Sequence, residues 1–182
     1  WSFEFENQPW FYGFRDLATN GVNKPVLNVF RMFGMMSGKR LEVKSNRMYP
    51  ITEVLKSSVS GQKSDIGALA SKDSKSGAVL VWNYHDSDKP GPTELVNLTI
   101  KNIPAKKVIL KIYLIDKENS NSYEVWKKMG SPQNPKKEQI KALEKSGKLN
   151  CVLIKKIKTS AAKILVPLKL ERQAVALVKL NW

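Results

Sequence analysis

The sequence predicts a mainly β protein, most of it an antiparallel β-sandwich, with one strand and one helix before the sandwich. Three observations support this fold class. From residue 39 onward, short runs of β-forming residues alternate with turn signals. Within residues 108–115, one face is wholly apolar and the other is mixed, which is typical of a sheet packed on one side. Residues 1–38 instead follow the order strand, long loop, helix.

The N-terminal segment predicts a strand over residues 1–9. Trp1, Phe3 and Phe5 alternate onto one face, while Glu4 and Glu6 lie on the other. Three aromatic side chains on one face and two carboxylates on the other are not typical of a surface strand. We expect both faces of this strand to be covered.

A helix is predicted after a long, aromatic-rich loop that runs to residue 23. Pro25 suits the first turn of a helix, because its missing N–H would have no partner there. Leu27, Phe30 and Phe33 recur at helical spacing, and Gly38 is a plausible end. Strand, loop and helix together form a βα unit.

The sandwich is predicted from eight short strands. They lie near residues 40–44, 66–71, 78–84, 94–101, 107–115, 150–157, 162–169 and 173–180. We expect the face that begins with Val108 to point into the core. Two helices interrupt the strands, a short one near residues 50–56 and one near residues 135–146, with Asn134 as its cap and Gly147 at its end. A polar hairpin connection is expected near residues 71–77.

Composition excludes several classes of function. Hydrophobic residues make up 42% of 182 residues, which fits a soluble globular protein with a real core. No apolar run approaches the roughly 20 residues of a membrane span, so no membrane is expected as a partner. The first residues do not resemble a secretory signal. The protein is expected to be soluble; a periplasmic or secreted location is compatible with this, and the compartment stays open.

The net charge of +15 raises the question of a nucleic-acid partner. The lysines are scattered over strands, loops and the second helix, without an arginine-rich run or an aromatic-lined basic motif. We therefore expect a solvated lysine face and no nucleic-acid partner, although weak attraction to polyanions at low salt is left open.

Metal, disulfide and nucleophile chemistry have little support in the sequence. Cys151 is the single cysteine, so no intrachain disulfide can form, and its apolar surroundings predict a buried, inert thiol. His85 is the single histidine, and we expect it to make a structural hydrogen bond. No metal site and no cofactor are predicted.

Four blocks of the sequence carry a family resemblance. They are WSFEFENQPW at residues 1–10, KPVLNVFRMF at 24–33, VLVWNYHD at 79–86, and NSNSY with MGSPQNP within 119–135. In this order they resemble the C-terminal part of glycoside hydrolase family 39, the β-xylosidase-like enzymes. The resemblance spans nearly the whole chain.

The resemblance implies that this chain is part of a longer enzyme. Residues 1–38 would be the last βα unit of a (β/α)8 catalytic barrel, and residues 39–182 an accessory β-sandwich. A barrel needs about 250 residues, so its remainder is absent from this chain and would lie in the same or another polypeptide. The chain begins at Trp1 without an initiator methionine, which fits a removed, omitted or separate N-terminal part.

The same resemblance implies where the chemistry lies. In this family, the acid/base and nucleophile glutamates are borne by barrel strands upstream of this chain, so no catalytic residue is expected here and the chain alone should be inactive. The last barrel strand would contribute Glu4, Glu6 and Trp1 to substrate binding. Carboxylates accept hydrogen bonds from sugar hydroxyls, and an indole packs against a pyranose ring. The complete enzyme would hydrolyse β-xylosides or related glycosides by double displacement.

Alternatives remain for parts of the chain. Glu4 and Glu6 could pair with barrel cations, Trp1 could be barrel core, and a bulge would be needed to bring all three to one sugar. Residues 119–135 are expected to form a structural loop, ordered by Tyr123 and Trp126, against the barrel or a neighbouring subunit, with a direct substrate contact as the alternative. A rival from another class is a stand-alone, non-catalytic sandwich that binds carbohydrate or a protein partner. Trp82, Tyr84 and Tyr113 could suggest a carbohydrate-binding face, but each lies within a strand pattern, where we expect core packing. A homo-oligomer is also left open.

Overall fold

The computed structural model describes residues 10, 11, 17–87 and 89–182, and it is mainly β with antiparallel sheets. The chain forms two compact units. The helical unit contains the described residues up to Phe33 together with Ile115–Asn150, and the sandwich unit contains Gly34–Leu114 and Cys151–Trp182.

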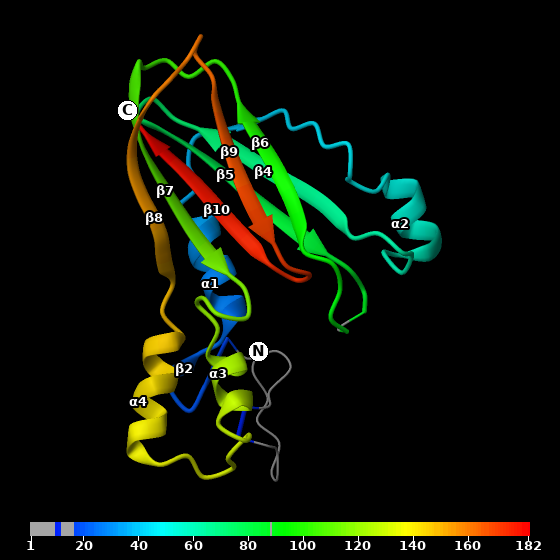
Figure 1. The fold of residues 1–182 in the computed structure, drawn as a ribbon, viewed down its shortest axis with the longest axis vertical. Coiled ribbons are helices and arrows are strands. Elements are labelled where there is room, and N and C mark those ends of the chain that lie inside the picture. The colour runs from blue at the N-terminus through cyan, green and yellow to red at the C-terminus, as the bar shows by residue number, and fades with distance from the viewer. Residues whose placement is uncertain (1–9, 12–16, 88) are drawn as a thin grey trace. The chain divides into compact units, whose positions relative to one another are not determined.

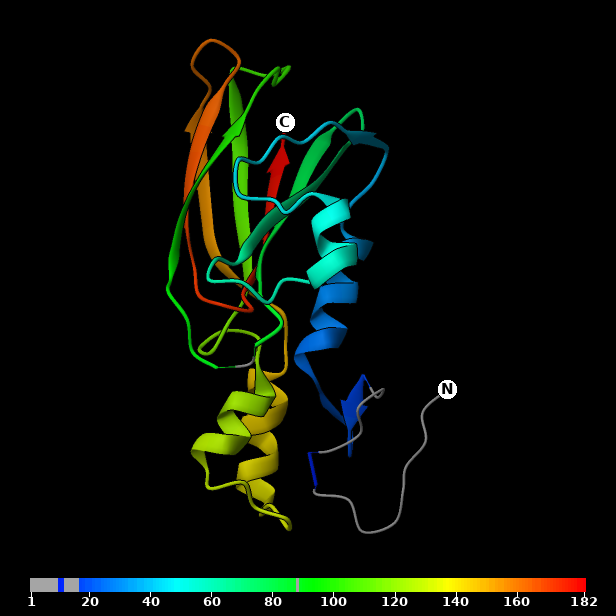
Figure 2. The same ribbon diagram turned by 90° about the vertical axis from the view of Figure 1, so that its right-hand side faces the viewer.

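The sandwich unit is built on two sheets. The larger sheet has six strands in the order β3 (Lys39–Leu41), β4 (Asp65–Lys72), β5 (Ser76–Tyr84), β10 (Val175–Asn181), β7 (Lys107–Ile115) and β8 (Asn150–Lys158). The smaller sheet pairs β6 (Glu94–Ile100) with β9 (Ile164–Leu170), and in Figure 1 these two strands lie in front of the larger sheet. Figure 2 shows the same strands from the side. The eight predicted strands are therefore confirmed, with ends that differ by a few residues.

The main core lies between the two sheets. On β7, Val108, Leu110 and Ile112 are buried, whereas Ile109 is exposed, so the predicted interior face is confirmed. The β9 strand alternates in the same way, from buried Ile164 onward, and faces this core. Alternation with a period of two specifies which face is buried, and this fixes the strand register.

A hairpin joins β4 to β5 where a polar connection is predicted. The Asp73 carboxylate accepts the backbone N–H of Lys75 at 2.8 Å and that of Ser76 at 2.7 Å. Hydrogen bonds from the Ser37 hydroxyl and from these two N–H groups lower the pKa of Asp73 to about 2, because they favour the charged form. The turn is thus held by a carboxylate that stays ionised at neutral pH.

A strained turn joins β8 to β9. Ser160 and Lys163 form an isolated β-bridge, and the two residues between them, Ala161 and Ala162, have φ of 48° and 55°. Two consecutive positive φ values are typical of a type I′ hairpin turn, which favours Asn-Gly. Alanine pays a steric cost in this conformation, because its Cβ approaches a neighbouring carbonyl oxygen.

We expect the double substitution Ala161→Asn and Ala162→Gly to stabilise the sandwich unit by about 1 kcal/mol, since it relieves this steric cost. Urea denaturation measures the free energy of unfolding. Ala142→Gly, in the middle of a helix, is the control for a generic glycine effect and should destabilise by about 1 kcal/mol. An unchanged or lower stability of the turn variant would contradict the assigned turn geometry.

The helical unit contains three helices and a small hairpin. They are α1 (Pro25–Gly34), α3 (Ser122–Lys128), α4 (Lys137–Ser146), β1 (Ala18–Thr19) and β2 (Val22–Asn23). The helices α3 and α4 lie side by side in both views (Figures 1 and 2). A further short helix, α2 (Ile51–Ser57), belongs to the sandwich unit and confirms the helix predicted near residues 50–56. None of the helices in the described ranges is long and apolar enough to cross a membrane.

The predicted helix ends need correction. The α1 helix begins at Pro25, as predicted, but it ends at Gly34. Gly38 has φ +78°, and a Cβ at this position would lie 2.0 Å from the Lys72 carbonyl oxygen. Glycine is therefore needed here because the backbone passes close to β4. The predicted cap Asn134 is wrong, because α4 starts later. There the backbone N–H of Lys136 donates to the Gln139 side chain at 2.8 Å.

Two elements were not predicted. The β1–β2 hairpin turns at Asn20-Gly21, whose φ values of 45° and 81° again fit a type I′ turn. The α3 helix occupies part of the segment predicted as a structural loop. Both carry recognisable signals in the sequence, an Asn-Gly pair and an Asn121 cap followed by Glu124.

The predicted division into residues 1–38 and 39–182 stays a prediction. The compact units of the structure differ from this division in the placement of one segment. Residues 115–150, which are inserted between β7 and β8 of the sandwich, group with the described residues up to Phe33. This insertion gives the helical unit two of its three helices.

Candidate functional site

The residues predicted to bind sugar lie outside the described residues. Trp1, Glu4 and Glu6 belong to this group, as does the whole strand predicted over residues 1–9. Their roles stay predictions. Among the described residues, no group of three or more His, Cys, Asp or Glu side chains could hold a metal ion.

The helical unit contains two of the family blocks, those at residues 24–33 and 119–135, and the second of them forms the cap of α3. The Asn121 side chain accepts the backbone N–H of Glu124 at 3.1 Å, which satisfies a donor at the start of the helix. The same side chain donates to the Asp116 carbonyl at 2.9 Å. The run NSNSY therefore forms a capped helix start instead of an irregular loop.

An aromatic cluster follows from this helix. Phe11 lies 5.4 Å from both Tyr123 and Trp126, measured between ring centroids, and the latter two rings are 5.8 Å apart. Trp126 is buried, and its indole N–H donates to the Pro132 carbonyl at 2.9 Å. Leu143 of α4 completes the cluster and is fully buried. Buried aromatic rings with a bonded indole N–H are typical of structural packing.

Asn28 of α1 forms hydrogen bonds that connect the two segments of this unit, the described residues up to Phe33 and Ile115–Asn150. It is fully buried, and its side-chain NH2 donates to the carbonyls of Ser120 and Gly147, each at 3.0 Å. Its side-chain oxygen accepts from the Arg31 guanidinium at 2.8 Å. The Ser122 hydroxyl donates to the Asn23 carbonyl, so a second bond joins the same two segments. The side-chain NH2 group and the side-chain oxygen of Asn28 therefore both form hydrogen bonds within the unit.

These contacts support a structural role for the block at residues 119–135. Side chains of this block, such as those of Trp126 and Ser122, bond or pack within the same unit, and the backbone carbonyl of Ser120 accepts from Asn28 of another family block. The expectation that this block contacts the barrel or a neighbouring subunit stays a prediction.

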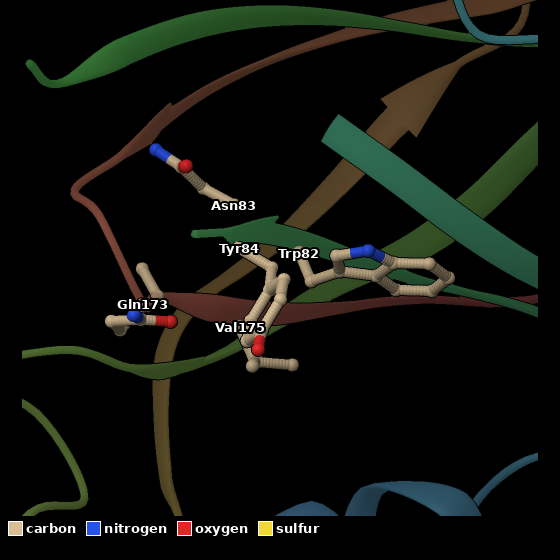
Figure 3. Close-up of a pocket in the computed structure, with 6 residues that line it drawn as sticks. Trp82, Asn83, Tyr84, Gln173 and Val175 are labelled. Atoms are coloured by element: carbon tan, nitrogen blue, oxygen red, sulfur yellow. The ribbon is translucent and has the colours of Figure 1, made fainter. Parts of the chain in front are cut away.

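The sandwich unit carries a shallow hollow of about 290 Å³ on the larger sheet. It is lined by Trp82, Asn83 and Tyr84 of β5, by Val175 of β10, and by Gln173 and Ala174, which precede β10. In Figure 3, Tyr84 and Val175 point to one side of the sheet and Asn83 points to the other. The lining thus combines aromatic and aliphatic side chains with the amide groups of Asn83 and Gln173.

Trp82 is fixed against its neighbouring strand. It pairs with Gly67 across β4 and β5, and a Cβ on Gly67 would come within 2.3 Å of the indole ring. The indole N–H donates to an Asp65 carboxylate oxygen at 2.9 Å, and the other oxygen accepts the Tyr49 N–H at 2.8 Å. Glycine at position 67 is therefore required for the indole to lie on the strand.

The three aromatic residues considered for a carbohydrate-binding face do not form one platform. Tyr84 is 45% exposed, which contradicts its predicted core packing, and its hydroxyl donates to Asp86 at 3.1 Å. That hydrogen bond raises the pKa of Tyr84. Tyr113 lies on β7, which β10 separates from β5, and burial raises its pKa. The hollow contains aromatic and amide groups but no carboxylate in its lining.

His85 has the structural role that was predicted. It is buried, its Nε2 lies 2.7 Å from the Gly61 carbonyl, and its Nδ1 accepts the Ser87 N–H at 2.9 Å. Both ring nitrogens are therefore hydrogen-bonded to backbone groups. The prediction for Cys151 is wrong, because this thiol is only partly buried. It lies on β8, which is the outermost strand beside β7 in the part of the chain that the structure describes.

Two comparisons of the sequence with known proteins both find glycoside hydrolases. The model of the family described as glycosyl hydrolases family 39 matches residues 2–154. A β-xylosidase of Caldicellulosiruptor saccharolyticus is 26% identical over 141 residues, which is 78% of this chain and 26% of that protein.

Solved structures show the same fold. A monomeric β-xylosidase from Caulobacter crescentus matches 95% of this chain and 34% of its own length, with a TM-score of 0.73 and 17% identity. A GH39 enzyme from Xanthomonas axonopodis pv. citri matches 88% of this chain and 31% of its own, with a TM-score of 0.69 and 14% identity. This chain spans about a quarter to a third of the length of these relatives. Because the family match covers most of its residues, the chain belongs to glycosyl hydrolases family 39.

Proposed function

We propose that this chain is the C-terminal part of a retaining glycoside hydrolase that cleaves β-xylosides. The observation that carries the proposal is the family match over residues 2–154, which includes the predicted sugar-binding residues Glu4 and Glu6. The β-xylosidase of Caldicellulosiruptor saccharolyticus, which is similar over 78% of this chain, supports the choice of substrate.

The proposed reaction is a double displacement. A retaining enzyme needs two carboxyl groups about 5–5.5 Å apart, one as nucleophile and one as acid/base. Glu4 and Glu6 do not suit these roles, because side chains at i and i+2 of one strand project in the same direction. The nucleophile and the acid/base would come from barrel strands outside this chain. No metal or cofactor takes part in the proposed reaction.

Glu4, Glu6 and Trp1 have the proposed role of holding the sugar. Ionised carboxylates form charge-assisted hydrogen bonds to hydroxyl groups, which are stronger than neutral ones. The indole of Trp1 offers an apolar face to the pyranose ring. Holding the sugar in a fixed position next to the nucleophile lowers the barrier by orientation alone.

The helical unit would support this arrangement. In the proposal, residues 1–38 are the last βα unit of a (β/α)8 barrel, and the remainder of the barrel is a partner in the same or another polypeptide. The Asn28 hydrogen bonds to Ser120 and Gly147 tie α1 to the inserted segment 115–150. The insertion would thus brace the last barrel helix and, through it, the strand that carries Glu4 and Glu6.

The configuration of the first product tests this function. The complete enzyme, made from a gene extended upstream, should release xylose from an aryl β-xyloside with its β-configuration retained. Proton NMR during the first minutes distinguishes β-xylose from α-xylose. Initial release of α-xylose would contradict double displacement, and absence of turnover would contradict the xylosidase assignment.

A further inference from the structure

One end of the sandwich unit carries a cluster of exposed lysines, which we call the lysine tip. It consists of Lys101, Lys106, Lys107, Lys156, Lys158 and Lys163. The β6–β7 connection and the β8–β9 turn, which carry or border these residues, lie at the same end of the sandwich in Figures 1 and 2. The tip therefore gathers positive charge from two segments that are distant in sequence.

Backbone hydrogen bonds hold the two segments of the lysine tip together. Thr159 N–H donates to the Lys106 carbonyl at 3.0 Å, and Ile103 N–H donates to the Ala162 carbonyl at 3.0 Å. The Thr159 hydroxyl adds a bond to the Ala105 carbonyl at 2.9 Å. Ile103 is buried in the sandwich core. The lysines thus extend from a fixed backbone frame, which reduces the entropy lost when they bind a ligand.

No carboxylate neutralises the tip from its own segments. Residues 95–115 and 145–170 contain lysines but no aspartate or glutamate. Among the described residues, the ion pairs involve Glu42, Glu94, Glu118 and Glu124, and none of them includes a lysine of the tip. Like charges without partners raise the local positive potential and attract a polyanion.

Protection of a sheet edge does not account for the whole cluster. Lysines on an edge strand oppose pairing with other chains, and this can explain Lys156 and Lys158 on β8. Lys101, Lys106 and Lys163 lie in connections between strands, where there is no ladder to protect. Their position calls for another explanation.

We infer that the lysine tip binds a polysaccharide that carries uronate groups, such as a xylan with glucuronate side chains. Lysine ammonium groups act as point charges for carboxylates. The tip contains no arginine and no aromatic side chain, which bases of a nucleic acid would need for stacking. The choice of a xylan rests on the proposed function, whereas the attraction to a polyanion rests on the lysine tip itself.

Affinity electrophoresis of the 182-residue chain in gels with glucuronoxylan tests the inference. The matched probe is the same polymer after reduction of its carboxyl groups. We expect retardation by the native polymer only, with apparent affinity falling at least about tenfold between 50 and 200 mM salt. No retardation by glucuronoxylan would overturn the inference, while β-xyloside hydrolysis by the complete enzyme would be unaffected by that result.

Two triple variants that change the net charge equally distinguish the effect of the lysine tip from the effect of total charge. K106E/K107E/K158E alters the tip, and K136E/K137E/K141E alters exposed lysines at α4. The tip variant should bind at least about tenfold more weakly, and the α4 variant should stay within about twofold. Circular dichroism checks that both are folded. Equal weakening by both, or equal or tighter binding to a DNA oligonucleotide of similar charge, would overturn the assignment.

Discussion

Replacing Glu4 or Glu6 by alanine in the complete enzyme should lower kcat/KM on an aryl β-xyloside by about 10- to 100-fold. Each carboxylate is proposed to accept charge-assisted hydrogen bonds from the sugar, worth about 1.5–3 kcal/mol, and this converts to the stated range. Folding should be nearly normal, because the change removes a ligand contact. Initial rates over a range of substrate concentrations measure the effect.

Glu118→Ala is the matched control for this experiment. Glu118 lies in the helical unit and forms an exposed ion pair with Lys128 at 2.7 Å, so its loss should leave the kinetics unchanged. If a variant of Glu4 or Glu6 retained wild-type kcat/KM, the sugar-binding role of that residue would be wrong.

Replacing Asn28 by alanine should lower the free energy of unfolding of the helical unit by about 2–4 kcal/mol. The substitution leaves the carbonyls of Ser120 and Gly147 without their donor in a fully buried position. An unsatisfied buried polar group costs about 1–3 kcal/mol, and two such groups are created here. Denaturant titration followed by far-UV circular dichroism measures the change.

The control for Asn28 is an exposed asparagine of the sandwich. Asn97→Ala on β6 removes the same amide from a solvent-exposed position, and we expect a change within about 0.5 kcal/mol. Hydrogen exchange adds a local reading, because the Asn28 variant should lose protection in α1 and α4 before it does so in β10. A stability change of Asn28→Ala no larger than that of Asn97→Ala would contradict the bracing role.

The sandwich was predictable because its signals are local. Alternation along residues 108–114 identifies the buried face of β7, and Pro25 marks the start of α1. The two elements missed, the β1–β2 hairpin and α3, also carry local signals, an Asn-Gly pair and an Asn121 cap. They were missed because both lie in segments rich in turn residues, where short elements resemble irregular loops.

Long-range features were not predictable from the pattern. The contact between Asn28 and Ser120 joins residues far apart in sequence, and no local rule indicates that residues 115–150 leave the sandwich to pack with α1. The partial exposure of Cys151 follows from the position of β8 at the sheet edge, which depends on the strand order. The sugar-binding residues were proposed from the family resemblance and stay predictions.

The central claim is that this chain is one part of a glycoside hydrolase whose catalytic carboxylates lie elsewhere. Comparing the purified, sequence-verified 182-residue chain with the complete enzyme, on an aryl β-xyloside, tests it most directly. We expect hydrolysis by the complete enzyme and no turnover above the uncatalysed rate by the chain alone, because no nucleophile and acid/base pair can be assembled from its residues. Turnover by the 182-residue chain that is abolished by Glu4→Gln would contradict the account.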